Sequence, residues 1–339
     1  MNLQHRYSVR EFTVRYRLES LLQLSLFSLL GYFSADLFNQ AKDLLLFITA
    51  WLLVFVVIAG GWPYAPPLGT VSRRIWKTGL LMSSLLPAAA VTTYLSLSLI
   101  RMFPPEYVGG SMIYVAGLWG VVLESWPMRH YHPRKAFAAG ALLSFPAAVV
   151  LSTLLQNRVA FESLFGFYLT HMALSFMFSP SLVFQGHPFH RLWRQPSIGF
   201  AAIFSTLPVA FAVFYLLGHL SSQSRQTMVA FFSSMILWQV LHSWAFCYLF
   251  SLKRTQPLRG LITSASTILT AAAWTYAWTN LTTPLNVAMV NLLIILPSLI
   301  IHNIFWLRKP FSAPLLFGSP AQGQTSLEKL NEWFLQVAD

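Results

Sequence analysis

Ten long apolar runs follow one another along the chain, and short stretches rich in proline, basic and aromatic residues separate them. An α-helix needs about 20 mostly apolar residues to cross the hydrocarbon of a bilayer. The pattern therefore predicts an all-α integral membrane protein with about ten transmembrane helices. The runs are Ser20–Phe38, Asp43–Gly61, Gly79–Ile100, Tyr107–Trp126, Phe137–Leu155, Ser163–Phe184, Ile198–Leu217, Gln226–Phe250, Gly260–Trp278 and Pro284–Trp306.

Two polar segments flank this predicted transmembrane domain, which covers residues 20–310. The N-terminal arm, residues 1–19, lacks the short basic region, apolar core and cleavage site of a signal peptide. The C-terminal tail, residues 311–339, contains the capping-box pattern Thr325-Ser326-Leu327-Glu328, which predicts the start of a short amphipathic helix.

Basic residues are distributed unevenly between the loops. The loops after even-numbered runs contain pairs or triplets of Lys and Arg, whereas the loops after odd-numbered runs contain at most one. Cytoplasmic loops of membrane proteins carry an excess of Lys and Arg. We therefore expect a protein of the cell or inner membrane with both termini in the cytoplasm.

The loops after even-numbered runs also resemble one another. Gln195-Pro196-Ser197-Ile198-Gly199 matches Gln256-Pro257-Leu258-Arg259-Gly260, and both glycines precede a tyrosine, Tyr215 or Tyr276, by 16 residues. This similarity predicts that the ten helices form five repeated hairpins, each too small to fold alone. The alternative is that short basic loops favour proline and aromatic residues independently.

Composition supports a membrane protein and limits the other classes. Hydrophobic residues make up 56% of the 339 residues and charged residues only 9%, whereas a soluble domain usually has about 25% charged residues. The net charge of +12 fits anionic lipid headgroups at the basic loops better than nucleic acid. The single cysteine, Cys247, excludes an internal disulfide and is expected to be a small buried apolar residue.

Polar residues inside the apolar runs are the first candidates for function. His171, His242 and His302 lie within the sixth, eighth and tenth runs, and Glu124 lies near the end of the fourth. Ionisable groups at such positions are costly and often line substrate or proton pathways. The simpler alternatives are a helix–helix hydrogen bond for each histidine and an ion pair with a nearby basic residue for Glu124.

Two histidine pairs in the loops are the second candidates. One pair is His130 and His132, and the other is His187 and His190, which precedes Arg191 and Arg194. Either pair could bind a metal ion or an anionic headgroup at the interface. A third metal ligand is missing nearby, so the sequence leaves both the metal and any other cofactor unknown.

These features favour a non-enzymatic protein, a permease or channel for a small solute or lipid-like molecule. A membrane enzyme or a haem- or metal-containing redox subunit is one alternative, and a non-catalytic scaffold subunit is another. We expect membrane lipids as partners, and further subunits or a homo-oligomer are compatible with the sequence.

Overall fold

A computed structural model describes about three fifths of the chain. The described residues are 21–33, 42–58, 85–96, 98, 105–127, 133–158, 173–185, 187, 189, 196–220, 225–245 and 254–304. They are mostly helical and include no strand, as the all-α part of the prediction requires. The N-terminal arm and the C-terminal tail both lie outside the described residues, as does Cys247.

The prediction of ten transmembrane helices is wrong. Among the described residues, we find no helix that combines the length and the apolar character needed to cross a membrane. The predictions of a multi-pass protein, of integral membrane localisation and of cytoplasmic termini are contradicted by the same finding. The described helices differ from the apolar runs that predicted them for two physical reasons.

The first reason is that several apolar runs form short helices rather than one long helix. α2 (Lys42–Leu53), α4 (Pro105–Gly117) and α8 (Arg225–Val240) each end in a π-helical turn after 12, 13 and 16 residues. The last apolar run is divided into α10 (Pro284–Val290), a π-helical turn and α11 (Leu296–Ile304).

The second reason is that the longer helices contain small, polar and proline residues throughout. α5 (Pro133–Arg158) has charged residues in its first and last turns and Pro146 inside, and α7 (Ser197–Leu220) contains Pro208. α9 (Leu258–Thr279) is rich in Ser and Thr. These residues interrupt the large apolar side chains along each helix.

The helices from the even-numbered runs form an inner ring. α2 packs against α4, and α8 packs against α10. Between these pairs, the π-helical turns η2 (Val54–Ile58), η3 (Leu118–Val122), η5 (Ser179–Val183) and η7 (Leu241–Ala245) contact one another in sequence order. η8 (Asn291–Ile295) contacts both α8 and α2, which closes the ring.

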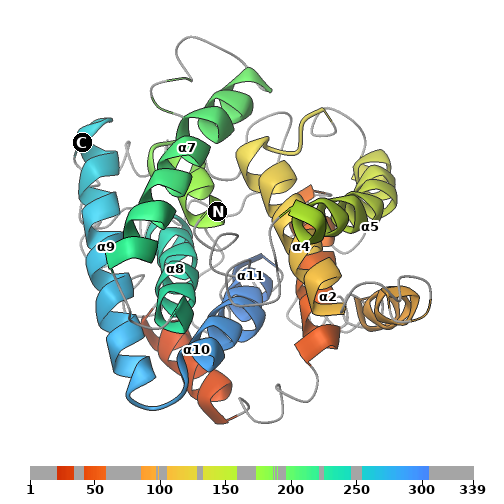
Figure 1. Ribbon diagram of the computed structural model, residues 1–339, viewed down its shortest axis with the longest axis horizontal. Coiled ribbons are helices and arrows are strands. Elements are labelled where there is room, and N and C mark those ends of the chain that lie inside the picture. Colours follow the sequence, from red (N-terminus) through yellow and green to blue (C-terminus); the bar gives the residue numbers. More distant parts are fainter. Residues whose placement is uncertain are drawn as a thin grey trace, which may run out of the picture.

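The helices from the odd-numbered runs lie outside this ring. α5 packs on α4 and η2, α7 contacts η3 and η5, and α9 packs on α8 and α10. α5 and α9 therefore lie at opposite sides of the molecule, with α2, α8 and α11 between them (Figure 1).

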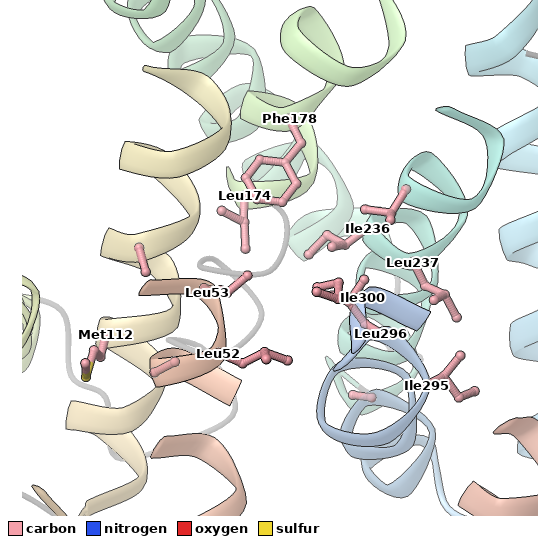
Figure 2. Packing of buried hydrophobic residues seen from close by; sticks show 14 of the residues in the cluster. Leu52, Leu53, Met112, Leu174, Phe178, Ile236, Leu237, Ile295, Leu296 and Ile300 are labelled. Atoms are coloured by element: carbon pink, nitrogen blue, oxygen red, sulfur yellow. The ribbon is translucent and has the colours of Figure 1, made fainter. Parts of the chain in front are cut away.

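Apolar side chains from the inner ring fill the centre. Leu53 of α2, Leu174 and Phe178 of the helical residues 173–178, Ile236 of α8 and Ile300 of α11 converge there (Figure 2). All belong to one buried cluster. Burial of a Leu, Ile or Phe side chain contributes about 1.5–3 kcal/mol, so this cluster is the main apolar contribution to the fold.

The five hairpin repeats are supported only weakly. Each of the five even-numbered runs contains a π-helical turn in its described part, and the described parts of the odd-numbered runs contain none. A π-helical turn is rare in proteins, so its recurrence agrees with a common origin of these segments. The agreement is limited to this local feature.

Glycines allow helices to approach closely at three of these contacts. A Cβ atom on Gly109 of α4 would lie 2.9 Å from Cβ of Leu46 in α2, and one on Gly140 of α5 would lie 2.9 Å from Cγ1 of Val54 in η2. At the start of α9, a Cβ atom on Gly260 would overlap the ring of Phe184 and lie 2.8 Å from its Cγ. This contact seats α9 directly against the end of η5.

We predict that Gly260→Ala destabilises the protein by about 1–3 kcal/mol, the usual cost of forcing an extra methyl group into a packed site. The measurement is thermal or denaturant unfolding followed by circular dichroism. Gly110→Ala in α4 is the matched control, because a Cβ atom there meets nothing within 4 Å. The control should be neutral or stabilising by up to about 1 kcal/mol, since alanine is the better helix former. Equal effects of both substitutions would show that the Phe184 contact does not seat α9.

Candidate functional site

A buried polar cluster joins α8, α9 and the π-helical turn η8. Its centre is Asn291, which is 1% exposed. The Asn291 side-chain amide donates hydrogen bonds to Ser234 Oγ at 3.0 Å and to Ser233 Oγ at 3.3 Å. Its Oδ1 accepts a hydrogen bond from Trp274 Nε1 at 3.0 Å. One side chain therefore connects three helical segments.

The hydroxyl groups around Asn291 also have partners. Ser233 and Ser234 both donate to the carbonyl oxygen of Ala230 in their own helix, at 2.8 and 2.7 Å. Thr275 of α9 donates to Ser234 Oγ at 2.9 Å. These donors are satisfied within the cluster, which is what a buried polar network needs in order to stabilise a fold.

A second polar contact joins α8 to the segment before η5. Gln239, which is 2% exposed, donates from Nε2 to the carbonyl oxygen of Ser175 at 3.0 Å and to Ser179 Oγ at 2.8 Å. Similar contacts join other pairs of helices. Ser152 of α5 donates to Ser111 of α4 at 2.9 Å, and Trp51 of α2 donates to Thr92 at 3.3 Å.

His242 lies in η7 and is 2% exposed. Its Nε2 lies 3.3 Å from Thr270 Oγ1 in α9, and its ring packs against Trp238 with centroids 5.5 Å apart. Because the Thr270 hydroxyl donates to the carbonyl oxygen of Ser266 at 2.7 Å, it accepts from His242, so Nε2 carries the hydrogen. Burial lowers the pKa of His242 to about 4, against a smaller opposing effect of the Ser266 backbone.

Among the other pathway candidates, the structure describes the side chain of Glu124 alone. His171 lies outside the described residues, and His302 lies in α11 but its side chain is not described. Glu124 follows η3 and is half-buried, with a left-handed backbone at φ 48°.

The position of Glu124 has a counterpart after η5. Glu124 is the second residue after η3, and Gln185, with φ 54°, is the second residue after η5. Both π-helical turns end with a backbone hydrogen bond to a carbonyl five residues earlier, from Leu123 to Leu118 and from Phe184 to Ser179. The shared geometry favours a role for this position in ending the helix, whether the side chain is an acid or an amide.

The loop candidates fall mostly outside the described residues. These are His130, His132, His190, Arg191 and Arg194. His187 is described: it is half-buried in a turn, and its backbone nitrogen donates to the carbonyl oxygen of Phe184 at 3.0 Å. In the part of the chain that the structure describes, no three His, Cys, Asp or Glu residues gather as a metal site would require.

A second candidate surface consists of apolar side chains that point outward from the outer helices. Leu142 of α5, Phe204 of α7 and Leu269 of α9 are 72%, 72% and 71% exposed. Neither Asp, Glu, Lys nor Arg occurs in residues 136–156, 197–217 or 260–281. We call these three exposed helix surfaces the outer apolar faces; exposed apolar patches of this kind mark sites of interaction.

The sequence analysis did not identify Asn291, Ser234 or Trp274 as candidate functional residues. A signal was available for Asn291, because an amide inside an otherwise apolar run has to find a partner when it is buried. The serine, threonine and tryptophan residues carried no such signal, since they are common in apolar helices.

No protein-family model matches the chain, and neither a curated protein nor a solved structure is significantly similar to it.

We predict that Asn291→Leu destabilises the protein by about 1–3 kcal/mol, because it leaves the buried Trp274 Nε1–H group without its acceptor. The free energy of unfolding from chemical denaturation measures the effect. Asn286→Leu in α10 is the matched control, since Asn286 is half-buried and its side chain makes one local bond to Thr282. The control should change stability by about 0.5 kcal/mol or less. A loss at Asn291 no larger than that of the control would contradict a structural role of the cluster.

We also predict a pH dependence from His242. Its folded-state pKa of about 4 lies below the ordinary value of 6.5, so the unfolded chain binds a proton more readily. The stability linked to this group is complete above pH 6.5 and falls as the pH decreases toward 4, by up to about 3 kcal/mol. His242→Gln should flatten this part of the profile of unfolding free energy against pH. Asn291→Leu is the control, as it destabilises without removing a titratable group and should keep the slope. A wild-type slope that survives in His242→Gln would refute the assignment.

Proposed function

We propose that this chain is a non-catalytic assembly subunit that binds an apolar partner through its outer apolar faces. The observation that carries the proposal is the exposure of Leu142, Phe204 and Leu269 on helix surfaces without charged residues. Large uncharged apolar surfaces are rarely left in contact with water. Their apolar side chains gain free energy, about 25 cal/mol per Å² of surface, when a partner covers them.

The buried polar cluster supports a structural role for the polar residues. In a permease or channel, polar side chains would have to bind a passing solute. Here the amide of Asn291 and the hydroxyls of Ser233 and Ser234 are engaged in hydrogen bonds with one another and with the backbone. This engagement favours the scaffold hypothesis over the permease hypothesis, because these groups hold helices together.

The neutral state of His242 supports the same role. Its Nε2 donates to Thr270 and its ring packs on Trp238. A histidine that binds a metal or relays protons needs a free ring nitrogen directed at its ligand. The contacts instead favour the simpler alternative from the sequence, in which this histidine joins two helices.

The proposal predicts that charge on the outer apolar faces weakens binding of an apolar partner while the fold persists. The test is Phe204→Glu combined with Leu269→Glu, in the purified full chain. We expect fewer detergent molecules bound per chain, measured by light scattering during gel filtration, and an unchanged helical circular dichroism spectrum.

Thr255→Glu is the matched control, because Thr255 is exposed just before α9 and lies outside the apolar face. It adds one carboxylate, against two in the double variant, and should leave the amount of bound detergent unchanged. If the double variant binds as much detergent as the wild type, the outer apolar faces are not the binding surface and the proposal fails.

A further inference from the structure

The exposed side of α9 carries apolar residues in a seven-residue repeat. One series is Leu258, Ala265 and Ala272, and the other is Ile262, Leu269 and Tyr276. Ile262 is half-buried and the other five are exposed. Successive members are alternately four and three residues apart, which is the spacing of the two core positions of a coiled coil. We call these six residues the α9 seam.

The α9 seam is not used for packing within the fold. α9 packs on α8 and α10 with a different side, where Thr263, Thr267, Ala271 and Thr275 are buried. The helix forms one edge of the molecule (Figure 1). α9 therefore has two apolar sides, one for the core of its own chain and one that faces outward.

Of the outer helices that the structure describes, α9 is the one whose face suits a second helix. Pro146 in α5 and Pro208 in α7 are both exposed. A proline inside a helix kinks it, so a straight partner helix cannot follow either of those faces closely. No proline interrupts α9 between Leu258 and Thr279.

The α9 seam is also complementary to its own reverse. Its midpoint is Thr267, halfway between Ala265 and Leu269. If a second α9 runs antiparallel with its Thr267 at the same level, the facing pairs are Ala265 with Leu269, Ala272 with Ile262 and Leu258 with Tyr276. Each pair joins a smaller side chain to a larger one, which fills the space between two helices. Every contact also occurs twice, as a twofold interface requires.

A parallel pair of α9 helices would lack this complementarity. Each residue would then face its own copy, as in parallel coiled coils. Two alanines would meet at the level of Ala265 and two tyrosines at the level of Tyr276, so narrow and wide layers would alternate along the contact. The order of side chains therefore favours the antiparallel arrangement.

Charge does not oppose contact between two α9 helices. The chain has a net charge of +12, so two copies repel each other wherever their basic surfaces meet. Residues 260–281 contain no Asp, Glu, Lys or Arg, which lets two copies approach here without pairing like charges. We propose that the α9 seam binds the α9 seam of a second copy of this chain, antiparallel and about a twofold axis at Thr267. The inference rests on the proposed function, because it names the partner of one of the outer apolar faces.

Disulfide trapping of the full chain tests the arrangement. Two differently tagged copies are expressed together, one with Ile262→Cys and the other with Ala272→Cys, both with Cys247→Ser because Cys247 is the single native cysteine. After an oxidant is added, cross-linked dimers are measured on non-reducing gels. We expect about tenfold more cross-link in this mixed pair than in either variant paired with itself, since two copies of residue 272 would lie about 15 Å apart along the helix axis, beyond the reach of a disulfide.

An exchange of side chains within one layer tests the complementarity. Ala265→Leu in both copies should lower the mixed cross-link about tenfold, because two leucines then overfill one layer. Adding Leu269→Ala should restore it, since the layer again holds one large and one small side chain. Ala277→Leu is the matched control, because Ala277 is exposed on α9 outside the α9 seam, and it should leave the cross-link unchanged. All variants should keep the helical circular dichroism spectrum.

Three outcomes would overturn the inference. Stronger cross-links between like positions would show a parallel contact, and no cross-link in any pairing would exclude a second copy as the partner of the α9 seam. A mixed cross-link that survives Ala265→Leu, or that Leu269→Ala does not restore, would show random collision. In each case reduced detergent binding by the Phe204→Glu and Leu269→Glu double variant would still support the proposed function, so failures of the two proposals can be distinguished.

Discussion

A polar side chain inside a packed helix bundle has to find its hydrogen-bond partners among neighbouring helices, because an unpaired buried polar group costs about 1–3 kcal/mol. Asn291 meets this requirement with three bonds at one point. Those bonds require α8, α9 and η8 to meet at a single register, since a shift of one residue would turn Ser234 or Trp274 away. The apolar side chains around them tolerate small displacements, so the polar cluster determines the alignment and the apolar core contributes most of the stability.

The π-helical turns place polar residues at these contacts. A π turn changes the angular position of every residue after it, because it inserts one residue into the helical repeat. Asn291 begins η8 and His242 lies in η7, so the contacts of Asn291 with Trp274 and of His242 with Thr270 in α9 come from such turns. The same turns bring neighbouring inner helices together, since η2, η3, η5 and η7 contact one another in order. The recurring π-helical turns therefore join adjacent helices of the inner ring.

The sequence predicted the helices well where an apolar run coincided with one uninterrupted helix. The run Gly260–Trp278 corresponds to α9, Leu258–Thr279, and the run Ile198–Leu217 corresponds to α7, Ser197–Leu220. Hydropathy could not locate the π-helical turns, because a π turn depends on local backbone hydrogen bonds and not on composition. For the same reason the transmembrane prediction failed: the length of an apolar run does not reveal where its helix is divided. His242 was predicted as a pathway residue, with a helix–helix hydrogen bond as the alternative, and its partner Thr270 could not be predicted because it depends on how η7 and α9 pack.

The comparison of Glu124 with Gln185 limits the role that the acidic side chain of Glu124 can have. The two residues occupy the same place after η3 and η5 and share a left-handed backbone, although one is an acid and the other an amide. A left-handed conformation is uncommon for residues other than glycine and costs about 1–2 kcal/mol, so the packing of the turn has to impose it. If backbone geometry defines this position, the charge of Glu124 is not needed for it. The polar groups that the fold depends on are then the buried ones, and the surface left for contact with other molecules is the uncharged one on the outer helices.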